Sequence, residues 1–335
     1  MRILIVGDFN FEIYEKSLAE AFTSLGHEVK DFSISERFQS TNNFYQKIQN
    51  QIQFGPNINK INNDLLSISK SNFDFIFLNR PRLIKSITLK KIKKHSKIFI
   101  YNNDDPFGDN YSFYFWWRYK TLLKHCDHIF AYRNKNLKDY RNIGLNNISL
   151  LRSWYIKKVN FPIKLEKIVD VVFIGHFEDD KRDYLFDFLI RNGVSLEIYG
   201  PGWEKSKFYK FFKSKQVVFS SLNIYEYNQK LNESKLAIAL FSKLNNDGYT
   251  RRCFEIPATK TPMLVFKTLE ILSLFNDKEA IFFETKEELL SKIRYYLKNL
   301  KQAEKIGING YERNLNSGNE ITDRAKQIIE TFYSL

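Results

Sequence analysis

The sequence predicts an α/β protein built from two Rossmann-like domains in tandem. Short apolar segments alternate along the chain with stretches long enough for a helix, which is typical of parallel sheets covered by helices. The pattern then restarts, because the apolar run 169–174 ends in Gly175 much as the run 2–6 ends in Gly7. Two similar strand-helix-strand starts in one chain indicate two such domains.

The first domain begins with a strand at residues 2–6 and a helix whose apolar positions include Leu18 and Ala21. Gly26 then ends that helix as a C-terminal cap glycine would, and the segment 28–32 is the second strand. Further strands of this domain are expected at 74–78, 97–101, 128–131 and 148–151.

The second domain repeats this order with a strand at 169–174, a helix at 181–191 that stops before Gly193, and a strand at 194–199. Later elements are expected at 236–240 (strand), from Arg252 (helix), at 263–266 and 280–283 (strands) and from Lys286 (helices). We therefore expect an N-terminal domain at 1–164, a C-terminal domain at 165–315, and a final helix within 316–335 that packs back on the first domain.

Composition excludes several classes of protein. The 335 residues are 43% hydrophobic and 16% aromatic, which excludes a disordered chain. No apolar run approaches the ~18 residues of a membrane span, and the short apolar run before Gly7 is too brief for a secretory leader. Cys126 and Cys253 cannot form a disulfide framework. We expect a cytoplasmic protein in a reducing compartment.

The net charge of +14 will attract anionic partners. Nucleic acid, an anionic membrane face carrying a lipid-linked substrate, and small phosphorylated ligands all fit this charge. Lys90, Lys93, Lys94 and Lys97 recur at helical spacing and could make a peripheral membrane contact, although a solvated helix face is the simpler interpretation. No motif that reads nucleic acid is present, so we do not expect nucleic acid as a partner.

Candidate site residues follow the expected strands, because ligands bind at the carboxyl ends of strands in such sheets. Asp104 and Asp105 follow the strand 97–101, where paired carboxylates could act as a base or bind a cation, or could simply form a turn. Arg251 and Arg252 begin a helix and could hold a diphosphate. Glu255 could accept ribose hydroxyls, or could form an ordinary ion pair along the helix.

The loop after residue 199 contains Gly200, Gly202 and Trp203. The glycines would let the backbone approach a ligand and the indole could stack on a base, or the segment could be a tight turn with a core tryptophan. The sequence lacks a complete dinucleotide fingerprint, a P-loop, a zinc-binding histidine pair and a nucleophile elbow. A redox cofactor or a bound metal is therefore not expected.

Several segments in order resemble the CgeB-like (spore maturation protein) glycosyltransferases, which have the two-domain GT-B fold. They are VGDFNFEIYEKSLAEAFTSLGHEV near the start, YNNDDPFGDN at 101–110, IFAYRNKNLKDYRNIG at 129–144, LLRSWY at 150–155, DVVFIGHFEDDKRDYL at 170–185 and LFSKLNNDGYTRRCFEIPAT at 240–259. The resemblance implies transfer of a sugar from a nucleotide-sugar donor, itself a substrate, to a glycan or lipid-linked glycan acceptor, without a metal or other cofactor.

The resemblance also implies roles for single residues. The donor would bind mainly the C-terminal domain, where Glu255 would hold the ribose and basic groups would meet the diphosphate. The implied donor-binding residues are Gly175, His176, Lys181, Arg182, Gly200, Gly202, Tyr249, Arg251, Arg252 and Glu255.

The acceptor would bind the N-terminal domain, and a carboxylate there would take its proton if the reaction inverts the sugar's configuration. Asp105, Asp8 and Asp104 are the candidates, and Asp105 is preferred over Asp8. Position 247, eight residues before Glu255, holds Asp where retaining enzymes of this fold have Glu, so inversion and retention both stay open.

Two alternatives compete with this interpretation. The first is a GT-A-like transferase in which Asp104 and Asp105 bind a divalent cation that carries the donor diphosphate. The second is a carbohydrate-binding or coat-assembly module that kept the fold and lost turnover.

Overall fold

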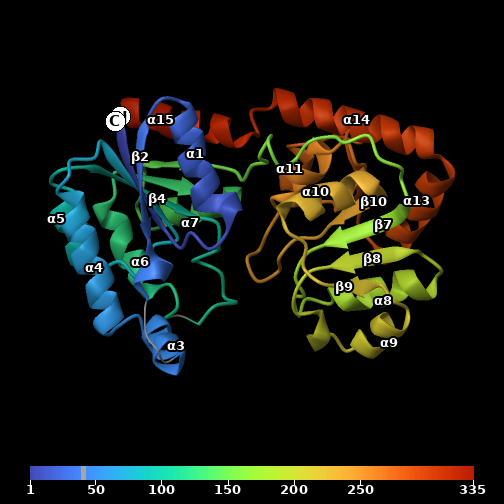
Figure 1. Ribbon diagram of the computed structural model, residues 1–335, viewed down its shortest axis with the longest axis horizontal. Helices are drawn as coiled ribbons and strands as arrows, with labels where there is room; N and C mark the ends of the chain where they lie inside the picture. Colours follow the sequence, from blue (N-terminus) through green and yellow to red (C-terminus); the bar gives the residue numbers. More distant parts are fainter. Residues whose placement is uncertain (39–42, 113) are drawn as a thin grey trace. The chain divides into compact units, whose positions relative to one another are not determined.

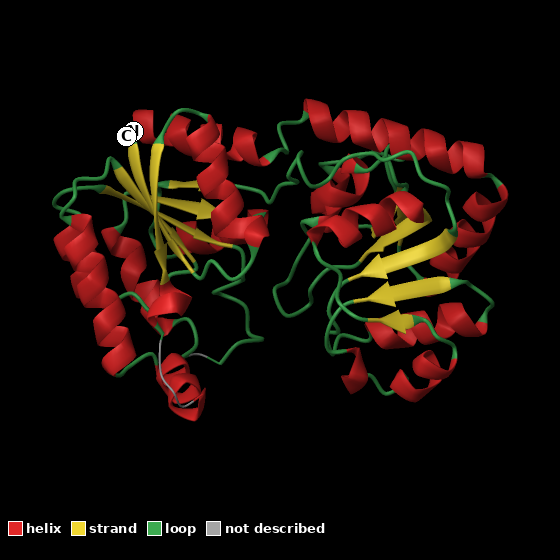
Figure 2. Ribbon diagram, viewed as in Figure 1, coloured by secondary structure: helices red, strands yellow, loops and turns green. Residues whose placement is uncertain are grey.

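The computed structural model describes residues 1–38, 43–112 and 114–335. These residues form two compact units: unit 1 comprises 1–152 and 321–335, and unit 2 comprises 153–320 (Figure 1). Each unit contains one six-stranded sheet in which all strand pairs are parallel. Helices lie on both faces of each sheet (Figure 2), which is the layered arrangement that buried parallel strands require.

The sheet of unit 1 has the strand order β2-β1-β3-β4-β5-β6. Its strands are β1 (Arg2–Gly7), β2 (Glu28–Ser33), β3 (Phe75–Asn79), β4 (Lys97–Asn102), β5 (His128–Ala131) and β6 (Ile148–Leu150). The predicted strands all form. The inner strands β1, β3, β4 and β5 have apolar side chains covered on both faces, whereas the edge strands β2 and β6 are partly exposed. Since β1 lies between β2 and β3, the loops after these three strands meet at one edge of the sheet.

Unit 1 contains one helix from the far end of the chain. Its helical elements are η1 (Glu12–Lys16, a π-helix), α1 (Ser17–Ser24), α2 (Ile34–Arg37), α3 (Asn43–Ile52), α4 (Pro56–Ser69), α5 (Ser86–Ile92), α6 (Trp117–Leu122), η2 (Leu123–His125), α7 (Asn134–Asn142) and α15 (Ile321–Tyr333). Helix α15 packs beside α1, and its Phe332 ring lies 5.7 Å from the ring of Phe75 in β3.

The lysine-rich segment of unit 1 is not one helical face. Helix α5 ends at Ile92, and Lys97 already belongs to β4, so the helical spacing of Lys90, Lys93, Lys94 and Lys97 is a wrong guide to their arrangement. Lys93 instead pairs with Asp127 at 3.2 Å. The continuous basic helix that motivated a membrane contact is therefore absent from this segment.

The sheet of unit 2 has the order β12-β11-β10-β7-β8-β9. Its strands are β7 (Val169–Ile174), β8 (Leu196–Tyr199), β9 (Val218–Phe219), β10 (Ser234–Ala239), β11 (Met263–Phe266) and β12 (Ile281–Phe283). The strand β9 was not predicted, because two residues carry no alternation that a sequence pattern could reveal. Strands β7 and β10 are adjacent, and the chain reverses its direction of travel across the sheet between them.

The helices of unit 2 surround this sheet (Figure 2). They are α8 (Arg182–Arg191), η3 (Trp203–Lys205, a 3₁₀ turn), α9 (Tyr209–Ser214), α10 (Ile224–Glu233), α11 (Arg252–Ala258), α12 (Leu269–Leu272), α13 (Lys286–Lys298) and α14 (Leu300–Asn316). None of the helices in the described ranges of the chain is both long enough and apolar enough to cross a bilayer.

The chain enters unit 2 earlier than the expected boundary between residues 164 and 165. The backbone N–H of Phe161 donates to the side chain of Asn228, and that of Ile163 donates to Asn232, at 3.1 and 2.7 Å. Both asparagines are buried on α10. The segment after Arg152 is thus tied to unit 2 by its own backbone hydrogen bonds.

Candidate functional site

The loops after β7 and β8 of unit 2 are built around glycine. Gly200 has a φ of +135°, and a side-chain Cβ at this position would lie only 2.6 Å from the carbonyl carbon of Gly175. Trp203 is 1% exposed, and its indole N–H donates to the carbonyl oxygen of Gly175 at 2.9 Å. Gly202 also has a positive φ, of +85°, at the start of the 3₁₀ turn. The tryptophan is a core residue that holds two loops together, so it is not free to stack on a base.

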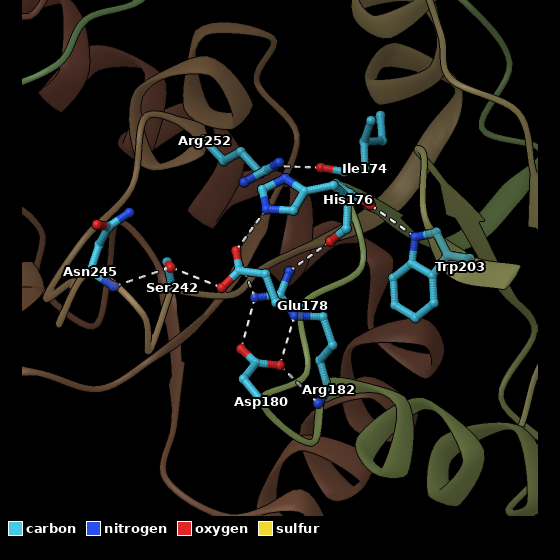
Figure 3. Close-up of polar contacts among 10 residues, drawn as sticks. Ile174, His176, Glu178, Asp180, Arg182, Trp203, Ser242, Asn245 and Arg252 are labelled. Atoms are coloured by element: carbon cyan, nitrogen blue, oxygen red, sulfur yellow. Dashed lines mark hydrogen bonds and ion pairs between the residues drawn. The ribbon is translucent and has the colours of Figure 1, made fainter. Parts of the chain in front are cut away.

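Arg252, the first residue of α11, reaches under the loop that follows β7. Its Nε donates to the carbonyl oxygen of Ile174 (Figure 3). A Cβ on Gly175 would lie only 2.7 Å from its Nη2. Within the described ranges, no carboxylate lies at ion-pair distance from this guanidinium. Arg252 therefore brings an uncompensated positive charge to the carboxyl end of the first strand of unit 2.

Glu178 organises the rest of this loop. His176 Nε2 lies 2.9 Å from Glu178 Oε1, and Ser242 Oγ donates to Glu178 Oε2 at 2.8 Å (Figure 3). Burial by itself would raise the pKa of Glu178, but the hydrogen bonds from His176 and Ser242 and the charge of Arg182 outweigh burial and lower it. A carboxylate thus links the loop after β7 to the loop after β10.

Arg182, which was expected to bind the nucleotide-sugar donor, already uses its guanidinium for contacts within the loop after β7. It is 5% exposed, forms ion pairs with Asp180 at 2.8 Å and Glu178 at 3.2 Å, and donates to the carbonyl of His176 at 2.8 Å. Two carboxylates offset its charge. The geometry therefore gives Arg182 the role of bracing the loop.

Glu255, on α11, is held by two partners. Arg251 Nε lies 3.0 Å from Oε1, and the hydroxyl of Tyr227 donates to Oε2 at 3.0 Å. Glu255 is 4% exposed, so this is a buried cluster and not a solvated surface pair. Burial and the charge of Glu255 raise the pKa of Tyr227 well above its usual value, which keeps the hydroxyl a donor. Each carboxylate oxygen retains a second lone pair that can accept a further hydrogen bond.

Two other residues that were expected to bind the nucleotide sugar have contrasting surroundings. Tyr249 is fully buried, and its hydroxyl accepts the backbone N–H of Ser153 at 3.1 Å, which anchors the segment that enters unit 2. Lys181 precedes α8 with a left-handed backbone (φ 74°) and is exposed. Lys181 is therefore accessible to a ligand, whereas the hydroxyl of Tyr249 serves the fold.

A cavity of about 590 Å³ lies at the carboxyl ends of β10, β11 and β12 in unit 2. Its aromatic wall comes from Phe241, Phe266 and Phe283, and Lys181 and Lys286 are among the cations that line it. This volume is within the usual range for small-molecule sites. The sequence analysis did not select these residues, although each of the three phenylalanines ends or directly follows a strand segment and could have been found by that rule.

The three carboxylates considered as bases in unit 1 differ sharply. Asp105 is completely buried: its Oδ1 accepts from the backbone N–H of Phe107 at 3.1 Å and from Asn136 at 2.8 Å, while Oδ2 pairs with Lys135 at 2.9 Å. These contacts fix the turn that follows β4. The preference for Asp105 over Asp8 therefore does not fit its surroundings, because a base must be accessible to its substrate.

Asp104 and Asp8 have other surroundings. Asp104 is 9% exposed and pairs with Arg80 at 2.5 Å. Asp8 follows β1 with an exposed side chain, and it lines a cavity of about 280 Å³ in unit 1 together with Arg80 and Arg82. Of the three, Asp8 alone combines an exposed carboxylate with a cavity.

Behind Asp8 lies Glu15, a buried carboxylate that the sequence analysis missed. Its Oε1 accepts from the backbone N–H of Asp8 at 3.2 Å and from the side chain of Asn79 at 2.6 Å. Burial, with the charge of Asp8, raises the pKa of Glu15. Gly7 makes room for this side chain, because a Cβ there would lie 2.6 Å from Glu15 Cγ.

The sequence analysis considered a metal bound by Asp104 and Asp105. Arg80 and Lys135 already pair with these two carboxylates. Across residues 1–38, 43–112 and 114–335, no group of three His, Cys, Asp or Glu side chains is arranged to hold a metal ion.

Comparison with known proteins adds information on family and fold. Residues 182–330, somewhat less than half of the chain, match the family model described as glycosyl transferase-like. No curated protein sequence matches the chain significantly.

Solved structures resemble the whole chain. Sucrose-phosphate synthase from Thermosynechococcus elongatus has a TM-score of 0.75 at 12% identity, covering 100% of this chain and 98% of that one. Anabaena Alr3699/HepE in complex with UDP and glucose has a TM-score of 0.71 at 12% identity, with 100% of both chains covered. A glycosyltransferase from Rickettsia africae ESF-5 has a TM-score of 0.70 at 13% identity, covering 99% of this chain and 98% of that one.

At such low identity these similarities establish the fold alone. Two parallel α/β sheets confirm the expected pair of Rossmann-like domains, and the GT-A-like alternative is wrong as a fold because it provides one such nucleotide-binding sheet. The chain thus has the GT-B fold of glycosyltransferases, and its residues 182–330 match a glycosyl transferase-like family.

Proposed function

We propose that the protein is a glycosyltransferase that moves a sugar from a nucleotide-sugar donor to a glycan acceptor without using a metal ion. The family match of residues 182–330, the GT-B fold and a structural neighbour that binds UDP and glucose support this proposal. The observation that carries it is Arg252, whose guanidinium lies beside Gly175 with no carboxylate partner among the described residues. The finer assignment to the CgeB-like family rests on the sequence segments alone.

In this proposal, unit 2 binds the donor. Negative charge grows on the nucleotide diphosphate as the bond to the sugar breaks, and a fixed cation stabilises that charge. Arg252 and Lys181 supply positive charge without a metal. Glu255, oriented by Arg251 and Tyr227, would accept hydrogen bonds from ribose hydroxyls through its remaining lone pairs.

Unit 1 would bind the acceptor, and Asp8 would take the proton of the attacking hydroxyl. Asp8 is preferred to Asp105 because its carboxylate is exposed and lines a cavity. Asp105 would instead hold the turn after β4. A carbohydrate-binding module without turnover shares the donor site and differs only in the absence of transfer.

Thermal melting of the full chain tests the donor site. UDP, GDP, dTDP, ADP and CMP would each be added with Mg²⁺ or with EDTA. We expect one nucleotide to raise the melting temperature equally in both conditions, since a ligand at about 100 times its Kd adds about 2.7 kcal/mol. The R252A variant should lose this shift.

The matched control is R191A, because Arg191 is an exposed arginine of unit 2 that pairs with Asp187 away from the loop after β7. The shift should survive in this control. If no nucleotide stabilises the protein, the donor site is wrong. If EDTA removes the shift, the proposed metal independence is wrong. If the donor binds but its sugar is not transferred when glycan acceptors are present, the binding-module alternative replaces the transferase.

A further inference from the structure

The cavity of unit 1 collects residues from three neighbouring strand ends. Asp8 and Asn10 follow β1, Ser35 follows β2, and Arg80 and Arg82 follow β3. Because β2, β1 and β3 are adjacent in the sheet, their loops meet over one opening of about 280 Å³. The cavity is large enough for a small charged group with part of a sugar, and too small for a whole nucleotide sugar.

Arg82 carries the electrostatic character of this cavity. Its contacts are with neutral groups: Nε and Nη2 each lie 3.4 Å from a backbone carbonyl, of Phe115 and Asn50 respectively. The guanidinium also stacks 3.6 Å from the centre of the Phe115 ring. No carboxylate in the described part of the chain forms an ion pair with it.

Arg82 is also partly withdrawn from water. Burial, reinforced by the neighbouring charge of Arg80, lowers the pKa of Arg82 to about 10, so the side chain stays charged at neutral pH. A desolvated cation with long, weak hydrogen bonds gains by meeting an anion. The guanidinium lies over the Phe115 ring, and its planar fork of N–H groups suits two parallel hydrogen bonds to one phosphate or carboxylate.

Arg80 adds a second, oriented cation. Its backbone adopts a left-handed conformation (φ 47°), and the side chain pairs with Asp104 while 40% of it remains exposed. Asp104 forms an ion pair with Arg80, whereas Asp8 and Asp104 act on the charge of Arg82 only from a longer distance, without an ion pair. Asp8 forms no ion pair with either arginine within the described residues, so its carboxylate stays available for a hydroxyl.

We propose that this cavity binds an anionic group, a phosphate or a carboxylate, on the acceptor, held mainly by Arg82 and beside Asp8. This inference rests on the proposed function, in which unit 1 binds the acceptor, and it narrows the acceptor to acidic or phosphorylated glycans. A neutral sugar would leave Arg82 without a partner of opposite charge.

Calorimetric titration of the full chain tests the inference with glucose 6-phosphate, glucuronate and glucose as probes. We expect the two anionic sugars to bind and glucose to bind at least about ten-fold more weakly. In R82Q the affinity for the anionic sugars should fall roughly ten- to hundred-fold, the range expected for losing charge-assisted hydrogen bonds. R82K, which keeps the charge but not the planar fork, should lie between them.

Two controls make the outcome decisive. R141Q removes an exposed arginine of α7 in the same unit and should bind as the wild type does. R252A reports whether the anion has instead entered unit 2. Loss of binding in R252A with retention in R82Q would overturn the inference, as would equal affinity for glucose.

The nucleotide-induced melting shift, measured on the same R82Q preparation, separates this inference from the proposed function. It also verifies folding. If the shift persists while anionic sugars bind R82Q as well as wild type, the anion site is wrong and the donor site stands. If anionic sugars bind through Arg82 while no nucleotide shifts the melting of any preparation, the donor site fails and the anion site stands.

Discussion

In each unit, a glycine at the end of the first strand makes room for a charged side chain, and the two side chains have opposite charges. In unit 1, Gly7 leaves room for the buried carboxylate of Glu15, and in unit 2, Gly175 leaves room for the guanidinium of Arg252. Gly7 is the last residue of β1 and Gly175 directly follows β7, and each is followed by a polar residue, Asp8 or His176. The matching loops therefore enclose side chains of different charge: the carboxyl group of Glu15 in unit 1 and the guanidinium of Arg252 in unit 2.

The arginines of the two units extend this comparison. Each unit has a paired arginine, Arg80 with Asp104 and Arg182 with Asp180, and an arginine without an ion-pair partner in the described ranges, Arg82 and Arg252. The paired residues stabilise loops, and the others are the candidates to bind ligands. Position after a strand does not separate the two kinds, but the presence of a nearby carboxylate does.

The largest expected effect on stability comes from adding a side chain to a glycine in these loops, and it should differ between the two units. In G200A the new Cβ would lie within 3 Å of the backbone of Gly175, and that backbone cannot shift cheaply. Gly200 also has a φ of +135°, which residues with side chains rarely adopt. We expect a loss of more than about 3 kcal/mol of unfolding free energy. In G7A the obstacle is the side chain of Glu15, which can shift, so about 1 to 2 kcal/mol is expected.

Urea denaturation measures both changes. G193A is the matched control, because Gly193 has a positive φ but no atom within 4 Å of the added Cβ, and it should lose about 1 kcal/mol. A G200A protein as stable as G193A would mean that the close approach of the two loops is not a constraint.

An intermediate effect separates two carboxylates within unit 1. In D105A the loss of buried hydrogen bonds to Asn136 and Phe107 should cost about 1 to 3 kcal/mol of stability. In D8A stability should stay within about 0.5 kcal/mol of the wild type, because Asp8 is exposed, while sugar transfer falls about 100-fold or more. Denaturation and transfer assays on both proteins would decide, and full transfer activity in D8A would exclude Asp8 as the base.

The smallest effect compares the buried carboxyl group of Glu15 with the partly buried one of Glu178. The folded pKa of Glu15 is raised, so the stability it contributes is present at low pH and is lost as pH rises through that pKa. The folded pKa of Glu178 is lowered, so its contribution is present above the unfolded pKa and is lost as pH falls through the folded value.

Substituting each carboxylate by the uncharged amide should therefore shift stability in opposite directions with pH. Relative to the wild type, E15Q should become more stable as pH rises from about 4 to 7, and E178Q should become less stable over the same range. Denaturation midpoints at the two pH values provide the measurement. Parallel changes in the two variants would contradict the opposite environments.

Much of the fold was predictable because its determinants are local. The apolar runs that became β1, β3, β4 and β7 are covered on both faces, and such strands are continuous apolar segments in sequence. The end of α5 at Ile92 was not predictable, because the lysines keep the same spacing past the end of the helix and into β4. Charged residues on a surface do not mark where a helix stops.

The candidate site was only partly predictable. The pairing of Arg182 is local, since Asp180 and Glu178 lie two and four residues before it, and could have been recognised. The position of Arg252 depends on the carbonyl of Ile174, far away in the sequence. The burial of Asp105 depends on Lys135 and Asn136, on a helix beyond the next strand. Long-range contacts of this kind have no signature in a single sequence.

Helix α15 gives the order of synthesis a consequence for folding. Residues 153–320 are complete as unit 2 before α15 is made, whereas unit 1, most of which is translated first, lacks the helix that packs beside α1 and meets Phe75. On the ribosome, unit 1 therefore cannot complete its fold until unit 2 has been translated, and one apolar face of unit 1 stays uncovered until then. Nascent chains arrested before residue 321 should bind chaperones through unit 1, and release should follow once α15 emerges.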